Sequence, residues 1–454
     1  MSYDIPKKLA KAVSYSWLIL TLSGCAVSGV LTSYPNEMAS VKDQLNSSDA
    51  SSVAAKLADK MKSSNPLLYA QEAGRAAQIS GDFASSIKLY DSAINSYLAL
   101  DDRAKVSLTH VGANSSSLLV NDKVIPYEGN LSERILLHQY QALNYLFNGN
   151  NVAAQVEMRR TNELQQRQQQ QLDQQSKTAQ QLSNGEVSAE VSRLKSIGDT
   201  PLNAGSYYVT GLLHELFGQP NDAYIDYRKA ATVLPDSPVL QQALLRLAQS
   251  LSMPQLEEFT QRWGKPVQPK ASQGRVVLLL ERGFVTPKTS FTLPFVVDNS
   301  VLSLSLPTYS EPGPLPAVPA TLFGSNTLSF APLTQFTQLE AAELSDRLPV
   351  IYTRQAARLA AKATLSHQTQ GDSTGALLGN ALMQIFNVVT EQADCRSWLT
   401  LPAQLDLLDN FTEQGQYQLH YGNNQQPVTV QAGRTTVVWI IDTGNLTRFY
   451  TKLL

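Results

Sequence analysis

Two segments of the sequence share the pattern of a helical hairpin, and this pattern constrains the fold more than any other feature. Pro66–Leu100 and Ser206–Asp236 each contain two helical patterns separated by a break that contains glycine. A weaker third copy covers Glu133–Arg160. One such hairpin cannot bury its apolar face alone, so neighbouring hairpins must stack into an array.

The hairpins carry small and aromatic residues where two helices would pack closely. Gly211 is expected at the helix crossing, Gly218 at the end of the first helix and Tyr227 between the two helices. The full set of expected packing residues is Gly74, Gly81, Phe83, Tyr90, Ala93, Gly211, Gly218, Ala223, Tyr227, Ala230 and Pro235. With these residues the segments resemble tetratricopeptide repeats (TPRs).

A glutamine-rich segment, Glu163–Leu182, continues the helix that is expected to begin near Val152. Glutamine favours helix, but apolar residues are too sparse here for a continuous coiled-coil seam. Two interpretations stay open. The segment is either a solvated helix extension or partly disordered arm, or a helix that docks a partner.

From Gly274 onward the sequence changes to strand patterns. The strand candidates are RVVLLLERG, FVTPKTSFTLPFV, VLSLSLPTY, SWLTLPAQLDLL, GQYQLHY and PVTVQAGRTTVVWIIDT. The last is expected to be a hairpin turned at Ala432–Gly433. A helical insertion at 338–392 interrupts the strands. Its apolar part, Ala376–Val389, predicts a buried helix over a sheet, or else a face for oligomerisation or membrane contact.

The predicted fold class is therefore α+β. An N-terminal TPR-like array of α-helical hairpins occupies 49–263 and includes the glutamine-rich helix at 163–182. A β-rich domain, an antiparallel sandwich or sheet with a helical insertion, occupies 264–454.

The first 25 residues have the order of a bacterial secretory signal. Three lysines precede an uncharged, mostly apolar run, Ala12–Leu22, which is too short to span a bilayer. The sequence Leu22, Ser23, Gly24, Cys25 follows and resembles the lipobox of bacterial lipoproteins. The resemblance implies cleavage before Cys25 and a lipid on its sulfur, with 1–24 as signal peptide. Residues 25–48 are expected to form a lipidated N-terminus and a polar tether that grades into a helix. Ala26, in place of aspartate, implies the outer membrane.

We expect no catalytic, metal or cofactor site. Gly371–Gly375 matches the G-x-S-x-G spacing of a hydrolase, but a helix precedes it where that motif needs a strand, so a loop is expected. The five histidines are dispersed without metal-ligand spacing, at His110, His138, His214, His367 and His420. A net charge of −2 gives no electrostatic reason to expect nucleic acid. Cys395 is expected to be a small buried residue.

A charged group lies beside apolar sequence at Glu391, Asp394 and Arg396, followed by Trp398. An arginine–carboxylate pair that joins the apolar helix to the SWLTLP strand is the expected role of this structural junction. Paired acids for general acid–base catalysis are the alternative, but the sequence gives no pocket against which they would be oriented.

Four segments also carry a resemblance to a family of proteobacterial outer-membrane lipoproteins with TPR-like repeats. The similar segments are ERGFVTPK (281–288), LPVIYTRQAARLAAKA (348–363), TEQADCRSWLTLPAQL (390–405) and ALNYLFNGNNVAAQVEMRR (142–160). Such proteins are often encoded beside a lipoprotein that activates penicillin-binding proteins. The resemblance covers most of the mature chain and implies an envelope role, but it brings no catalytic residues to carry over.

Together these features predict a non-enzymatic scaffold that is anchored in the outer membrane by its lipid and binds envelope proteins, among them another lipoprotein. Oligomerisation is compatible with the sequence. A structural protein that binds glycan or peptidoglycan is the alternative, and a hydrolase is a third reading.

Overall fold

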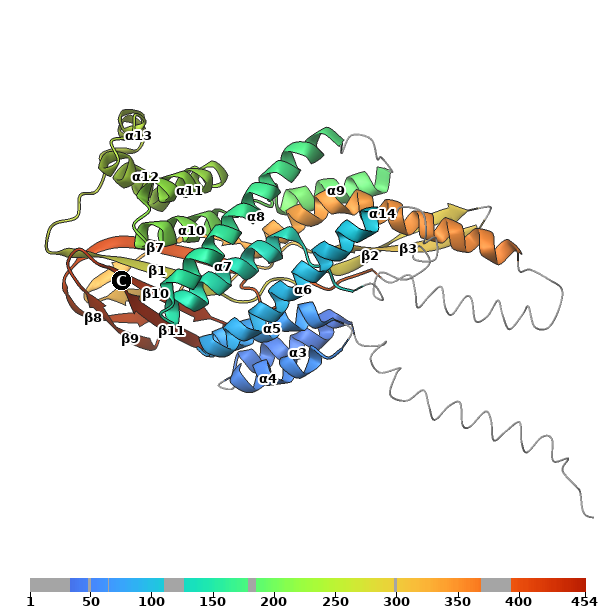
Figure 1. Cartoon of the computed structure of the whole chain (residues 1–454), viewed down its shortest axis with the longest axis horizontal. Helices are drawn as coiled ribbons and strands as arrows, with labels where there is room; N and C mark the ends of the chain where they lie inside the picture. Colours follow the sequence, from blue (N-terminus) through green and yellow to red (C-terminus); the bar gives the residue numbers. More distant parts are fainter. Residues whose placement is uncertain are drawn as a thin grey trace, which may run out of the picture.

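The computed structural model describes residues 33–47, 50–63, 65–109, 126–178, 185–297, 300–368 and 393–454. The lipobox with Cys25, the Gly371–Gly375 loop, the Ala376–Val389 segment and Glu391 lie outside these ranges. The chain is α+β: the helices α3 to α13 come first, and a β-rich region with the long helix α14 follows (Figure 1). Within the described ranges, no helix combines the length and apolar character needed to cross a membrane.

The three predicted helical hairpins are confirmed. They are α5 (Pro66–Ile79) with α6 (Phe83–Thr109), α7 (Leu131–Phe147) with α8 (Asn151–Thr178), and α10 (Ala204–Leu216) with α11 (Pro220–Val233). The other helices of this half are α3 (Tyr34–Leu45), α4 (Ala50–Lys60), α9 (Gly185–Ile197), α12 (Pro238–Ser250) and α13 (Leu256–Trp263). Proline opens α5, α11 and α12, where its missing N–H has no intrahelical partner to lose.

The predicted packing residues lie where the helices of a hairpin touch. A Cβ atom at Gly74 would overlap the ring of Tyr90, and one at Gly211 would lie 2.6 Å from Cε1 of Tyr227. Gly218, just after α10, has a φ of +72°, which favours glycine. Both tyrosines are fully buried, and so are the alanines Ala93, Ala223 and Ala230. Gly81 follows α5, Phe83 begins α6 half-buried, and Pro235 follows the end of α11.

The folded region begins earlier than predicted. Residues 25–48 are expected to form a tether that grades into a helix, ahead of the array at 49–263, but α3 begins at Tyr34 and buries Met38 and Leu45 completely. The expected change from tether to helix therefore comes at Tyr34, and the few apolar residues of α3 recur at helical spacing and pack on the array.

Among its described residues, the β half contains three sheets. A five-stranded sheet has the order β11-β10-β1-β7-β6, a four-stranded sheet has the order β5-β4-β8-β9, and β2 and β3 form a separate hairpin. The strands are β1 (Gln273–Arg282), β2 (Thr289–Val297), β3 (Ser300–Thr308), β4 (Thr321–Phe323), β5 (Asn326–Leu328), β6 (Ala331–Gln335), β7 (Gln404–Glu413), β8 (Gly415–Tyr421), β9 (Asn424–Val430), β10 (Thr435–Asp442) and β11 (Thr447–Leu453). The larger sheet is mixed, because β1 runs parallel to β10 and antiparallel to β7.

The strand β1 is buried on both faces. Val276, Leu278 and Leu280 share a cluster with the four-stranded sheet, whereas Val277 and Leu279 face the helices. Successive side chains of a strand point to opposite faces. An uninterrupted apolar run is therefore what a central, doubly covered strand requires.

Two strand predictions are wrong. No hairpin forms at Ala432–Gly433 because β9 pairs with β8, whereas β10 pairs with β1 and β11, so this turn carries the chain from one sheet to another. SWLTLP is not a strand either. β7 begins only at Gln404. Residues 393–403 precede it, and we name them the junction loop. The N–H groups of Trp398, Leu399 and Thr400 bond to helix side chains, and at the end of the loop Ala403 N–H donates to the Arg282 carbonyl of β1.

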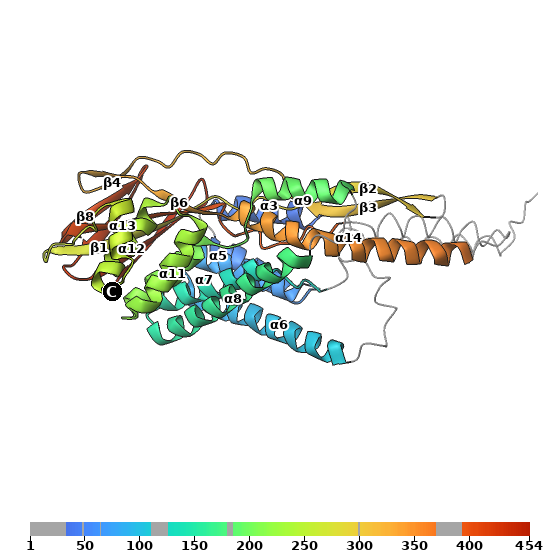
Figure 2. The same cartoon turned by 90° about the horizontal axis from the view of Figure 1, so that it is seen from above.

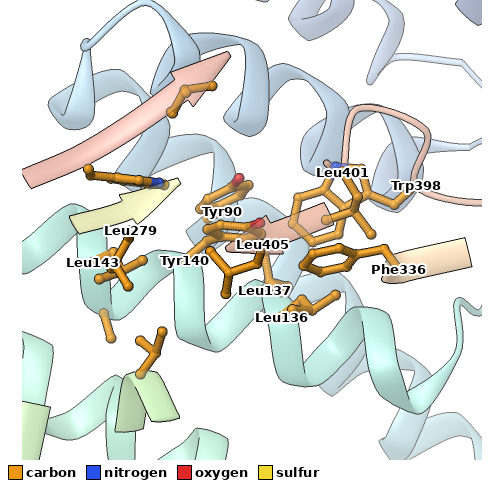
Figure 3. Packing of buried hydrophobic residues seen from close by; sticks show 14 of the residues in the cluster. Tyr90, Leu136, Leu137, Tyr140, Leu143, Leu279, Phe336, Trp398, Leu401 and Leu405 are labelled. Carbon is orange, nitrogen blue, oxygen red and sulfur yellow. The ribbon is translucent and has the colours of Figure 1, made fainter. Parts of the chain in front are cut away.

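One hydrophobic core spans the helical half and the five-stranded sheet. Tyr90 and Tyr140 from the helices, Leu279 from β1 and Trp398 from the junction loop lie together in it (Figure 3). The boundary predicted near residue 264 therefore coincides with a change in secondary structure, and the core continues across it.

An extension at the end of the molecule away from the C-terminus has a core of its own (Figure 2). It consists of α9, the β2–β3 hairpin and α14 (Phe336–Gln368). Leu304 and Leu306 of β3 pack there with Leu348 of α14. The helix predicted within Gln338–His367 is confirmed, and the rest of the predicted insertion, up to residue 392, lies outside the described ranges.

Candidate functional site at the junction loop

The junction loop brings Asp394, Arg396 and Trp398 to the contact between helices and sheet. The Arg396 guanidinium donates to both Asp394 carboxylate oxygens, with Nε–Oδ1 and Nη2–Oδ2 distances of 2.8 and 2.7 Å. It also donates to Oδ1 of Asn65, the residue before α5, at 2.6 Å. An arginine–carboxylate pair is thus present, but both of its partners lie in the junction loop, and the bond to Asn65 links the loop to α5. The predicted role between the apolar helix and a SWLTLP strand is not observed, because SWLTLP is not a strand and Ala376–Val389 lies outside the described ranges. Trp398 is fully buried.

Glu72 of α5 holds the next part of the junction loop. Its carboxylate accepts hydrogen bonds from the backbone N–H groups of Leu399 and Thr400, at 2.7 and 3.0 Å, and from the hydroxyl groups of Thr400 and Tyr34. Burial raises the pKa of Glu72 to about 7, and these four donors hold the pKa below what burial alone would give. A single buried carboxylate therefore replaces the strand partner that this part of the loop lacks.

Three further carboxylates converge beside the loop, and we name this cluster the carboxylate chamber: Glu133, Glu340 and Glu343. Glu343 of α14 accepts from the first two N–H groups of α7, at 2.8 and 3.1 Å. Glu133 accepts from the N–H of Trp398 at 2.8 Å and from the Tyr127 hydroxyl. The chamber thereby ties α7, α14 and the junction loop together.

Glu340 is the least satisfied member of the chamber. It is 3% exposed and lines a cavity of about 100 Å³ together with Lys288 and Glu343. Its Oε2 accepts from Nδ2 of Asn130 at 2.7 Å and from the Tyr309 hydroxyl at 3.4 Å, whereas Oε1 has no hydrogen-bond partner among the described residues. Burial, and then the charge of Glu133, raise the pKa of Glu340 to about 8.

This raised pKa predicts a pH-dependent stability. A carboxyl group with a raised pKa binds its proton more tightly in the folded state, so stability decreases as the pH rises from the ordinary value of 4.5 towards 8. Glu340→Gln keeps the acceptor for Asn130 and removes the charge. We expect its unfolding free energy to exceed that of the wild type at pH 8, and the slope between pH 5 and 8 to flatten by up to about 1.4 kcal/mol per pH unit.

Urea denaturation at a series of pH values measures this effect. Glu163→Gln, at an exposed position of α8, is the matched control and should reproduce the wild-type profile. A Glu340→Gln profile parallel to that of the wild type would contradict the assignment.

The polar groups of this site form buried hydrogen bonds that connect the helices to the junction loop. Within the described ranges, no group of three or more histidine, cysteine, aspartate and glutamate side chains could hold a metal ion. His138 pairs with Glu157 at 2.6 Å, and His214 lies near Asp226 at 3.6 Å, so both histidines contribute to contacts between helices. Cys395 is half-buried, less than predicted, with its thiol 3.4 Å from the Thr289 carbonyl oxygen.

A second hollow lies between α8 and α11, and we name it the glutamine groove. It has a volume of about 490 Å³, and its lining residues are Gln165, Gln166, Gln169, Gln170, Leu202, Tyr207, Lys229, Thr232 and Val233. The glutamine-rich segment is thus more than a solvated extension, since Gln165 and Gln168 are buried and donate to the hydroxyl groups of Ser206 and Ser132. The sequence signal for the groove was the run of glutamines itself.

The opposite side of the hairpins is occupied by the chain's own β half. α5 is buried from Leu67 to Ile79, and most of α7 and α10 is buried as well. Arg75 of α5 pairs there with Glu281 of β1. Comparison with protein families, curated proteins and solved structures finds no match, so the functional argument rests on this geometry.

Proposed function

We propose that this protein is a non-enzymatic scaffold of the bacterial cell envelope, anchored in the outer membrane by a lipid on Cys25. The order of lysines, apolar run and Leu22–Cys25 supports the anchor. The observation that carries the scaffold role is the glutamine groove, which stays open on an array of helical hairpins whose other side is filled by the sheet. Helical-hairpin arrays characteristically offer such extended surfaces to partners.

The proposed partners are envelope proteins. The candidates are alternatives: a lipoprotein activator of a peptidoglycan synthase, a secretion assembly or a surface-appendage complex. The resemblance of 281–288, 348–363 and 390–405 to outer-membrane lipoproteins supports this choice of compartment.

Replacement of Cys25 tests the anchor. Cys25→Ser should abolish labelling by a palmitate analogue and prevent flotation with outer-membrane vesicles, because two or three acyl chains provide nearly all of the membrane affinity. Cys395→Ser is the matched control and should keep both properties. Normal labelling of Cys25→Ser would refute the lipoprotein assignment.

A further inference from the structure

The wall of the glutamine groove contains a buried glutamine whose amide is held in a fixed orientation. Gln165 is 2% exposed, and its Nε2 donates to Oγ of Ser206 at 2.9 Å, which fixes the orientation of the amide. The carbonyl oxygen Oε1 of the same amide is buried and has no hydrogen-bond partner among the described residues. A buried acceptor without a partner is unfavourable. Because this oxygen is covered by the protein, a ligand in the groove would meet the exposed amides of Gln166, Gln169 and Gln170.

The charge of the groove indicates a neutral ligand. Lys229 is the one charged side chain among the described residues that line it. Its Nζ lies 3.4 Å from Oδ1 of Asp226 and 5.7 Å from the centre of the Tyr207 ring, so its charge is already compensated within the protein. The remaining polar lining consists chiefly of amides, which both donate and accept hydrogen bonds.

The spacing of these amides matches an extended peptide. Gln166 and Gln170, which are both exposed, are four residues apart on α8. Four residues of helix rise about 6 Å, whereas two residues of an extended chain span about 6.6 Å. Successive amides on the helix therefore meet every second residue of a peptide that lies along it, and the apolar side chains of Leu202 and Val233 can contact the residues between.

We infer that the glutamine groove binds an extended, uncharged peptide segment of a protein partner by hydrogen bonds to its backbone. This inference rests on the proposed scaffold function and names the chemistry of its partner. A glycan fits less well, because sugar rings stack on exposed aromatic faces and Tyr207 is only 4% exposed, with Lys229 over its ring.

A binding assay with defined probes tests the inference on the full-length lipidated protein in detergent. The probes are the peptide Ac-(Thr-Ala)₅-NH₂, the same peptide with N-methylated alanines, and chitotetraose. We expect saturable binding of the first peptide and at least tenfold weaker binding of the N-methylated peptide, since methylation removes backbone donors. Equal binding of the two peptides, or binding of chitotetraose alone, would overturn the inference.

A variant with two exposed glutamines of the groove replaced by alanine tests the role of their amides in peptide binding. Gln166→Ala combined with Gln170→Ala should weaken peptide binding at least tenfold, with an unchanged melting temperature because both side chains are exposed. Val152→Ala, at a 76% exposed position near the other end of α8, should leave binding unchanged. Unchanged binding in the double variant would contradict the assignment.

Crosslinking in cells separates this inference from the scaffold proposal. A photo-crosslinking residue at Gln170 should capture an uncharged segment of one envelope protein, identified by mass spectrometry, and the same residue at Val152 should not. If the lipidated protein crosslinks to a partner only from other positions, the assignment of the peptide site to the glutamine groove is refuted. The scaffold proposal is then retained. Capture of a second copy of this chain at Gln170 would overturn the assignment to a separate partner.

Discussion

Replacing Arg75 by leucine is expected to lower the free energy of unfolding by about 3–5 kcal/mol. Arg75 is 1% exposed and pairs with Glu281, which is 4% exposed. Its guanidinium carbon also lies 4.6 Å from the ring centre of Tyr140 and 5.7 Å from that of Trp439. Without the arginine, the Glu281 carboxylate stays in the shared core without its counterion, which is the main source of the expected loss.

The matched control removes both charges. Arg75→Leu combined with Glu281→Leu should recover most of the loss, because a buried ion pair can be replaced by apolar side chains at little cost. Urea denaturation followed by tryptophan fluorescence measures all three proteins. A double variant no more stable than Arg75→Leu alone would show that the helix–sheet contact depends on the ion pair itself.

The helical half could be predicted because its signals are local. Gly74 meets Tyr90 and Gly211 meets Tyr227, and in both hairpins the partners are sixteen residues apart in the sequence. The small residue and the aromatic ring that needs its space are therefore visible together in one short segment. The same holds for β1, whose continuous apolar run already indicates burial on both faces.

The pairing of strands could not be predicted in this way. β10 lies next to β1, more than 150 residues away in the sequence, and not next to β9, from which a short turn separates it. Turn residues at Ala432–Gly433 are compatible with a hairpin and equally with a connection between two sheets. The choice depends on which faces become covered, and that is a property of the assembled molecule.

The burial of the glutamate carboxylates beside the junction loop also could not be predicted from the sequence. Glu72, Glu133 and Glu340 lie in helices, where glutamate is usually solvated. The role of Glu72 and Glu133 becomes apparent only with the junction loop, because the N–H groups of Trp398, Leu399 and Thr400 bond to these two carboxylates. SWLTLP looked like a strand because it is apolar, but apolar composition does not reveal where the backbone N–H groups find acceptors.

Both halves should unfold in one transition, and Trp398→Ala should lower the free energy of that transition by about 3–5 kcal/mol. The Trp398 ring is fully buried and meets Tyr90 and Tyr140 edge-on, with ring centres 5.7 and 5.9 Å apart. Removing it leaves a cavity where the helices meet the junction loop (Figure 3).

Trp263→Ala on the peripheral helix α13 is the matched control and should cost less than about 1.5 kcal/mol, because that ring is only partly buried. Urea denaturation followed by circular dichroism measures both variants. Equal losses in the two variants, or separate transitions in the wild type, would contradict a core shared by helices and sheet.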